Sequence, residues 1–311
     1  MVATNPETIG AESARNWRDW WSLNQRKVVP YLFITPTLAI FLVFVLFPIA
    51  YSAVISFFKW NGISEPEFSG LKNYLRLLED PIFWTSLQNT VNFTLGVVPL
   101  SMAFGLLAAL GLNRPQLPGR AVLRAIYFLP FVISAVATAT TAGWIFGDTF
   151  GVLNKMLVEL GLKKVQWLTN RHTAMMTVVI VTIWVRLGFC MLIYLAGLQS
   201  IPPDLVEAAR VDGASRWQQF RHITFPLLKP TTFLLIVLNI IYSFEVFDLV
   251  FVLTNGGPGY ATTVLTVFIY NSAFQTQRVG YASAIGIVFM AIIMTITLIQ
   301  WRISNEGGRI S

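Results

Sequence analysis

Six apolar stretches of about membrane thickness constrain this chain more than any other feature of its sequence. A helix needs about 20 apolar residues to cross roughly 30 Å of hydrocarbon. Of the 311 residues, 55% are hydrophobic and only 12% are charged, whereas a soluble domain carries about 25% charged residues. We therefore predict an all-α integral membrane protein with six transmembrane helices, over residues 31–58, 86–112, 125–145, 174–198, 231–253 and 282–301.

The flanking segments predict the topology. Residues 1–30 are polar, without the apolar core or cleavage site of a secretory signal, and Trp17, Trp20 and Trp21 beside basic residues indicate a short interfacial helix. Lys and Arg are more frequent in one alternating set of segments, which comprises residues 1–30, 113–124, 199–230 and 302–311. This bias places both termini and the loop 199–230 in the cytoplasm. The expected organisation is a cytoplasmic N-terminal segment (1–30), a membrane domain (31–301) and a cytoplasmic tail (302–311).

The loop 199–230 is too long and too polar to be a simple turn between two spans. Pro202 and Pro203 suit the start of a helix. Gly213 is a stop signal, because glycine adopts the left-handed conformation without penalty. Ser215 and Gln218 have the spacing of a capping box at the start of a second helix. The pattern predicts two short helices around a tight turn.

Two ordinary interpretations of this loop are a plain connector and a DNA-binding helix-turn-helix. The loop contains four basic and three acidic residues, namely Arg210, Arg216, Arg221 and Lys229 against Asp204, Glu207 and Asp212. So balanced a segment lacks the positive field that phosphate binding requires. The overall charge of +7 and pI near 9.7 fit anionic membrane lipid better than nucleic acid.

The same loop resembles the EAA loop of binding-protein-dependent ABC importer permeases. The matching positions follow the family's spacing and are Glu207, Ala208, Ala209, Asp212, Gly213, Ala214, Phe220, Ile223, Pro226 and Pro230. One position departs from the pattern, since Phe225 stands where leucine is commoner. The resemblance extends from about Tyr31 to Trp301 and is strongest to carbohydrate permeases such as those of the maltose and glycerol-3-phosphate importers.

The resemblance implies a type I ABC importer permease (MetI-like) fold with a cytoplasmic coupling loop, in a bacterial inner membrane. It also implies three kinds of partner: a second, homologous permease, two cytoplasmic ATPase subunits and an extracytoplasmic solute-binding protein. The coupling residues would be those from Glu207 to Pro226 named above. ATP and Mg²⁺ would be held by the partner ATPases, because the chain has no G-x-x-x-x-G-K-[ST] motif.

Three ionisable residues fall within the predicted spans, where a charge is costly and usually functional. Arg186 lies near the middle of the fourth span, and Glu245 and Asp248 lie three residues apart in the fifth. We expect Arg186 to pair with one of these carboxylates. Such charges either fix helix register or belong to a polar substrate pathway, and both interpretations stay open. The pathway would be lined by Arg186, Asn239, Tyr242, Ser243, Glu245 and Asp248.

The segment after the fifth span cannot form regular structure, because its glycines and proline break any periodicity. It is either a plain loop or, by resemblance to sugar permeases, a contact for the solute-binding protein through Asn255, Gly256, Gly257 and Pro258. Short surface helices are expected before the second span, up to Leu78, and over residues 152–160.

Catalytic and metal chemistry are not indicated. The single Cys190 lies within a span as a small apolar residue, and the two histidines, His172 and His222, are far apart without neighbouring ligands. The resemblance to carbohydrate permeases implies a transporter subunit for a sugar, oligosaccharide or polyol, with glycerol-3-phosphate as an alternative substrate. An ion-coupled secondary transporter is the alternative from another class, although it would leave the EAA segment unexplained.

Overall fold

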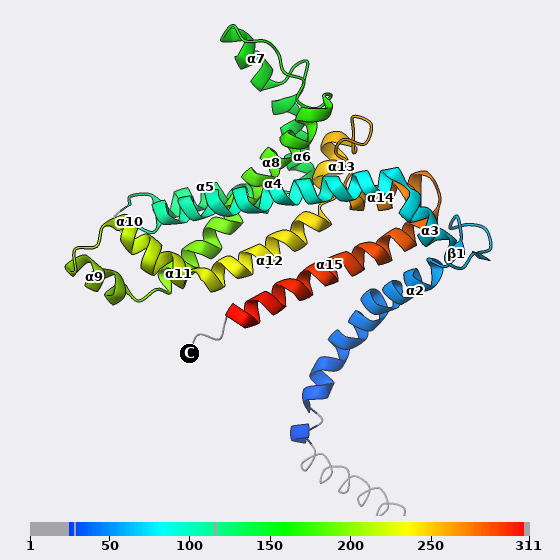
Figure 1. Cartoon of the computed structure of the whole chain (residues 1–311), viewed down its shortest axis with the longest axis horizontal. Coiled ribbons are helices and arrows are strands. Elements are labelled where there is room, and N and C mark those ends of the chain that lie inside the picture. The colour runs from blue at the N-terminus through cyan, green and yellow to red at the C-terminus, as the bar shows by residue number, and fades with distance from the viewer. Residues whose placement is uncertain (1–24, 28, 115–116, 308–311) are drawn as a thin grey trace, which may run out of the picture. The chain divides into compact units, whose positions relative to one another are not determined.

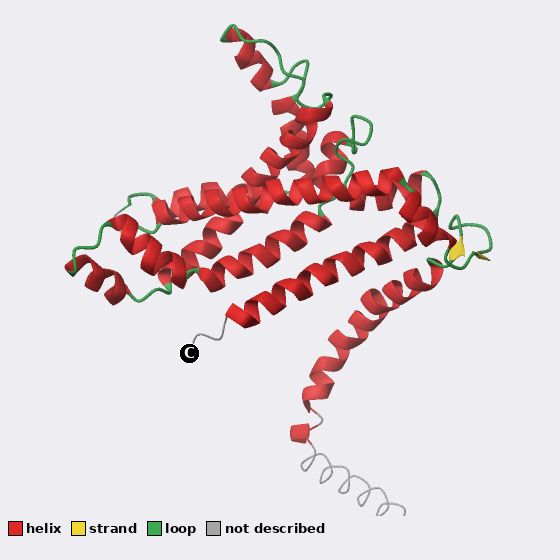
Figure 2. Ribbon diagram, in the orientation of Figure 1, coloured by secondary structure: helices red, strands yellow, loops and turns green. Residues whose placement is uncertain are grey.

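A computed structural model describes residues 25–27, 29–114 and 117–307, which are almost entirely helical (Figures 1 and 2). The chain divides into two compact units, residues 1–55 and 56–311. The first unit contains an apolar helix, Gln25–Ile55, which includes a π-helical turn η1 (Leu42–Leu46) and α2 (Phe47–Ile55). The interfacial helix predicted around Trp17 lies outside the described residues.

The second unit is organised around three long helices, α4 (Pro81–Leu112), α8 (Arg171–Gln199) and α15 (Val279–Gly307). The start of α4 follows from its sequence, because Pro81 occupies the first turn and the Asp80 carboxylate accepts a hydrogen bond from the Ile82 N–H at 2.8 Å. Within the described part of the chain, four helices are long and apolar enough to cross a membrane, or up to six if each of two bent helix pairs is one span.

The first bent pair is α5 (Arg120–Val132) and α6 (Ala135–Phe146), whose axes differ by 99°. The predicted span 125–145 is therefore two helices. Helix α5 continues through Pro130 to Val132, and the break follows at Ile133 and Ser134. The second bent pair, residues Arg216–Leu227 and α12 (Lys229–Glu245), turns by 62°.

The predicted helix over 231–253 is wrong as a continuous element. Helix α12 ends at Glu245, and a separate short helix, α13 (Asp248–Thr254), begins after Val246 and Phe247. Val246 has an extended conformation, and its carbonyl oxygen accepts a hydrogen bond from the Thr266 hydroxyl. A side chain from elsewhere thus satisfies a backbone group that the break releases, which is how broken helices are tolerated within membranes.

Short elements occupy the ends of the second unit. A two-stranded antiparallel ribbon, β1 (Phe58–Lys59) and β2 (Glu67–Phe68), precedes α3 (Lys72–Glu79). Helices α7 (Val152–Glu159) and α14 (Leu265–Tyr270) and the π-helical turn η3 (Asn271–Gln275) complete this part. The surface helices predicted up to Leu78 and over 152–160 are confirmed as α3 and α7.

Small residues allow the long helices to pack closely. A Cβ atom added at Gly105 of α4 would lie 2.5 Å from the Cβ of Cys190 in α8. One added at Gly188 of α8 would lie 2.0 Å from the Tyr127 carbonyl oxygen of α5. Such close backbone approach is typical of helix pairs in membranes, where dispersion contacts rather than water exclusion drive packing.

The segment between α6 and α8 is held by two polar side chains. Asn154 is 1% exposed, and its amide bonds the backbone of Asp148 at 3.0 Å and of Val165 at 2.8 and 2.9 Å. The Asp148 carboxylate accepts from the N–H groups of Leu168 and Thr169, both at 3.0 Å, and from the Thr169 hydroxyl. Burial works to raise the pKa of Asp148, but these hydrogen bonds outweigh it and hold that pKa below its ordinary value.

Candidate functional sites

The hairpin, residues 199–230, is an exposed helix–turn–helix at the end of α4 that carries Leu112 (Figure 1). Its first helix is α9 (Pro203–Val211), and its second begins with α10 (Arg216–Gln219) and continues through η2 (Phe220–Thr224) and α11 (Phe225–Leu227). The predicted pair of short helices is thereby confirmed. No residue of α9 or α10 is buried, so the outer surface of the hairpin, which carries both polar and apolar side chains, is free within the described part of this chain.

The turn between the two helices is a Schellman motif built around Gly213, whose φ is +81°. The Gly213 N–H donates to the Arg210 carbonyl at 3.1 Å, and the Ala214 N–H donates to the Ala209 carbonyl at 2.9 Å. These two bonds satisfy carbonyls that the end of α9 leaves free. The predicted stop at Gly213 therefore rests on a conformation that favours glycine.

A capping box fixes the start of the second helix. The Gln218 N–H donates to Ser215 Oγ at 3.3 Å, and the Ser215 N–H donates to Gln218 Oε1 at 2.7 Å. The Gln219 side chain donates to the Ala214 carbonyl at 2.7 Å and ties this helix to the turn. Two orphan helix ends are thus closed by the loop's own residues, which makes the hairpin a defined element rather than a flexible connector.

The predicted coupling residues occupy different parts of this hairpin. Glu207, Ala208 and Asp212 are exposed. Ala209, Asp212, Gly213, Ala214 and Ile223 line a groove of about 380 Å³ between the two helices. Phe220 stacks on Trp217 with ring centroids 5.6 Å apart, and Pro226 lies in α11.

Within the second unit, Arg186 forms the centre of a buried polar cluster. Its side chain is 4% exposed, and its Nε donates to Asn239 Oδ1 of α12 at 3.1 Å. The guanidinium carbon lies 4.2 Å from the centroid of the Tyr242 ring and 4.4 Å from that of Phe189, and the Phe131 ring lies 5.5 Å away. Aromatic faces and an amide therefore surround the cation.

The expected ion pair between Arg186 and Glu245 or Asp248 is wrong. Among the described residues, the one ion pair within 4.0 Å joins Lys59 and Glu67. Glu245 and Asp248 are both exposed, and the break after Glu245 removes the helical face that the two carboxylates were expected to share.

The structure brings three of the predicted pathway residues together, namely Arg186, Asn239 and Tyr242. Asn239 and Ser243 are 0% exposed, so both lie inside the packed chain. Among the described residues, the Ser243 hydroxyl has no hydrogen-bond partner. The pathway residues are thus divided between a buried cluster and an exposed pair of carboxylates at the end of α12.

The predicted irregular loop after the fifth span is confirmed, but threonine side chains order it. Asn255 and Gly256 have positive φ values of 50° and 80°. Thr262 Oγ1 donates to the Gly257 carbonyl at 2.8 Å, and Thr263 Oγ1 donates to the Gly256 carbonyl at 2.9 Å. The segment containing Pro258 is therefore a shaped protrusion rather than a plain linker.

Sequence reasoning missed the aromatic residues that surround Arg186 and the side chains that hold the protruding loop. Phe131 and Phe189 are indistinguishable from lipid-facing aromatics within an apolar span. Asn89 of α4 donates to the carbonyls of Tyr260 and Thr263 at 2.8 and 3.0 Å, and no local spacing links it to that loop. The available signal was the rarity of an arginine within a span, which predicts partners but not their kind.

Apolar helices of membrane length, with an exposed helix–turn–helix between two of them, are typical of a multi-span membrane protein. The chain belongs to the family described as the binding-protein-dependent transport system inner membrane component, whose model matches residues 101–305. This confirms the predicted family. The chain is thus a multi-pass inner-membrane permease subunit with a type I importer fold, and not an enzyme.

Relatives match nearly the whole chain. The probable ABC transporter permease protein YurN of Bacillus subtilis (strain 168) is 39% identical, covering 92% of this chain and 99% of that protein. The trehalose/maltose transport system permease protein MalF of Thermococcus litoralis is 39% identical, covering 88% and 93%. A bacterial alginate ABC transporter, solved in complex with an alginate pentasaccharide-bound periplasmic protein, has a chain with a TM-score of 0.82 and 28% identity, covering 93% and 98%.

Proposed function

We propose that this chain forms half of the translocation path of an ATP-driven importer for a sugar, an oligosaccharide or a related polyol. The substrate class rests on the relatives, one named for trehalose and maltose and another from an alginate transporter. The observation that carries the proposed mechanism is the exposed hairpin, in which the EAA pattern coincides with a rigid, capped turn.

In this proposal the chain crosses the membrane six times, with α5 and α6 together forming the third span and α12 and α13 together forming the fifth, and with both termini in the cytoplasm. The hairpin faces the cytoplasm and docks in a groove on an ATPase subunit. Glu207, exposed on α9, makes a polar contact there. A second, homologous permease completes the path, and two ATPase subunits bind ATP and Mg²⁺.

The base of the hairpin suits it to transmit movement. Leu228, between α11 and α12, is 0% exposed, and a Cβ added at Gly197 of α8 would lie 3.0 Å from its side chain. The exposed hairpin is therefore attached to the membrane helices through Leu228, which packs against α8 and directly precedes α12. Closure of the ATPase pair on ATP would move the hairpin, and α8 and α12 would move with it between inward- and outward-open states.

On the opposite side, the protruding loop at Asn255–Pro258 contacts the solute-binding protein. The polar cluster around Arg186 and Asn239, with the carboxylates of Glu245 and Asp248, borders the substrate path. Tyr242 then has two roles, since its ring packs on Arg186 and its hydroxyl can exchange hydrogen bonds with a polyol.

Purification of the tagged chain from its native membrane tests this assignment. We expect an ATPase subunit and a second permease to accompany it, and the reconstituted complex to accumulate saccharide only when ATP and the solute-binding protein are supplied. Uptake by the isolated chain, driven by an ion gradient without ATP, would contradict the proposal. Uptake of glycerol-3-phosphate in preference to saccharides would retain the importer and reject the substrate class.

A further inference from the structure

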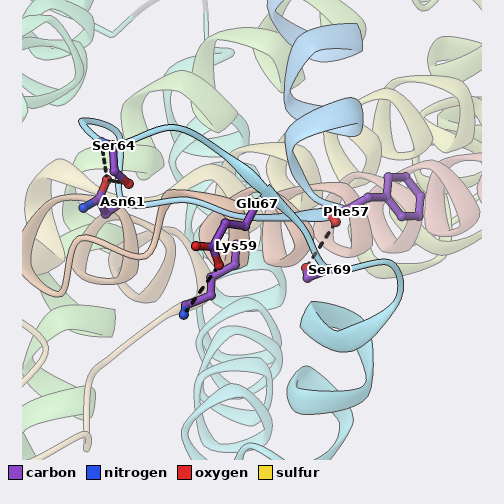
Figure 3. A network of polar contacts seen from close by, with 6 residues as sticks. All are labelled: Phe57, Lys59, Asn61, Ser64, Glu67 and Ser69. Carbon is purple, nitrogen blue, oxygen red and sulfur yellow. Dashed lines mark hydrogen bonds and ion pairs between the residues drawn. The ribbon is translucent and has the colours of Figure 1, made fainter.

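A polar pocket of about 460 Å³ lies at the end of α4 opposite the hairpin, away from the sites described above. The β1–β2 ribbon, the start of α3 and the junction of η3 with α15 form its walls. Figure 3 shows the ribbon, where Asn61 orders the turn by accepting from the Ser64 N–H at 2.8 Å, and the Ser69 N–H donates to the Phe57 carbonyl at 2.9 Å. The pocket is thus built from ordered backbone.

Positive charge predominates in this pocket. Its lining contains four cations, Lys59, Lys72, Arg76 and Arg278, and two carboxylates, Glu65 and Glu67. Lys59 Nζ and Glu67 Oε2 are 4.0 Å apart, the one ion pair within that distance in the described part of the chain. Lys72, Arg76 and Arg278 therefore have no carboxylate within 4.0 Å there, and the pocket is suited to an anion.

Arg76 is held in place by aromatic packing. Its guanidinium carbon lies 5.2 Å from the centroid of the Tyr281 ring. The Tyr281 hydroxyl donates to Asp80 Oδ2 at 2.7 Å, and the tyrosine is 5% exposed. Because a buried ring fixes one face of the guanidinium, its N–H edge remains available for an anion.

Helix α3 has three chemically different faces. Leu77 is 2% exposed and packs into the core of the second unit. Leu71 and Leu75, four residues apart, and Leu78, three further on, form a second face and are each 60–61% exposed. Lys72 and Arg76 share the third face. An exposed apolar face beside a basic face is the pattern of a helix at the lipid boundary.

The apolar face of α3 continues into a membrane helix. Trp84, in the first turn of α4, is 51% exposed, and its indole Nε1 donates to the Leu78 carbonyl at 2.9 Å. Tryptophan is enriched at membrane–water interfaces. If α4 enters the bilayer at Trp84, the exposed leucines would lie at the depth of the acyl chains and the cations of the pocket would lie at headgroup level.

We propose that this pocket binds the phosphate headgroup of an anionic phospholipid, whose acyl chains lie against Leu71, Leu75 and Leu78. A soluble anion would use the cations and leave the leucines in water. A lipid accounts for both features, because its charge and its chains are joined in one molecule.

The test measures the affinity of the purified transporter complex in detergent for phosphatidylglycerol and phosphatidylcholine by native mass spectrometry. We expect the wild type to prefer phosphatidylglycerol. The K72Q/R76Q variant should bind phosphatidylglycerol on the order of tenfold more weakly, with little change for phosphatidylcholine. The control K163Q/K164Q removes the same charge from two exposed lysines elsewhere and should bind like the wild type.

Three results would overturn the proposal. They are equal weakening by the control pair, no preference for phosphatidylglycerol in the wild type, and displacement of the lipid by millimolar glycerol phosphate, which would indicate a soluble-anion site. A fourth result would also overturn the proposal. If K72Q/R76Q keeps its lipid affinity but its transport is no longer stimulated by the solute-binding protein, the pocket is a protein-docking site instead. If K72Q/R76Q does not fold, R278Q removes one cation from the opposite wall and should weaken phosphatidylglycerol binding in the same direction.

Discussion

Replacing Gly213 with valine isolates the contribution of the hairpin turn, because no atom lies within 4 Å of a Cβ built at this position. The substitution therefore acts through the backbone alone. A left-handed conformation costs a non-glycine residue roughly 1–2 kcal/mol, and a β-branched side chain is a strong outlier there. Weakening the two turn hydrogen bonds adds roughly 0.5–1.5 kcal/mol each. The native turn should be disfavoured by about 2–5 kcal/mol, a change of roughly 30-fold or more in its population.

The assay is the ratio of substrate imported to ATP hydrolysed in proteoliposomes containing the complete transporter. We expect Gly213→Val to insert and assemble, to keep basal ATP hydrolysis and to lose most coupled uptake. Gly213→Asn is the matched control, since asparagine tolerates the left-handed region, and it should keep a coupling ratio close to wild type. Wild-type coupling in the valine variant would refute the reasoning that a rigid turn transmits the movement.

Three further predictions follow from individual positions. Gly188→Ala places a methyl group against the α5 backbone and should lower the thermal midpoint of the detergent-solubilised protein by several degrees. The control Gly111→Ala has open space around it and should leave the midpoint unchanged. Equal midpoints for the two variants would contradict the close packing at Gly188. Reversing both Arg186 and Glu245 should restore no more transport than the worse single reversal, because the two do not pair; rescue would establish contact. Since the folded-state pKa of Asp148 lies below its unfolded value, its contribution to stability is complete above the unfolded pKa and is lost as pH falls through the folded pKa. Hydrogen-exchange protection factors over residues 149–170, which correct for the intrinsic pH dependence of amide exchange, should fall in that acid range for the wild type, and an Asp148→Asn variant should show no such step.

The hairpin was predictable from sequence because its signals are local. Gly213 indicates where α9 ends, and the pair Ser215 and Gln218 indicates where the second helix begins. Each signal depends on residues within one turn of the position that it determines. The same holds for Asp80-Pro81 at the start of α4. Elements in contact with water carry such cap chemistry, and their boundaries follow from it.

The breaks within the apolar segments were less predictable. A proline such as Pro130 favours a kink in the third segment, but it indicates neither the position of the break, three residues further on, nor its 99° size. The break after Glu245 has neither glycine nor proline, and its residues, Val246 and Phe247, are ordinary for a span. What makes the break tolerable is the hydroxyl of Thr266, twenty residues away. A composition-based argument detects that a segment is apolar, and the location of a break depends on tertiary contacts that it cannot contain.

The environment of Arg186 shows why a charge within a span does not by itself identify an opposite charge. The prediction assumed that a buried cation requires a carboxylate, because an isolated ion is costly in a low-dielectric medium. Here an amide oxygen of Asn239 accepts from Nε, and the rings of Tyr242 and Phe189 cover the guanidinium at 4.2 and 4.4 Å. Arginine tolerates this better than lysine would, because its charge is delocalised, weakly hydrated and flat enough to stack. Glu245 and Asp248 are then left exposed, free to face whatever lies beyond the surface of this chain. Replacing Arg186 with lysine should consequently destabilise the chain even though the positive charge is kept, because an ammonium group keeps the desolvation cost and loses the stacking on the rings.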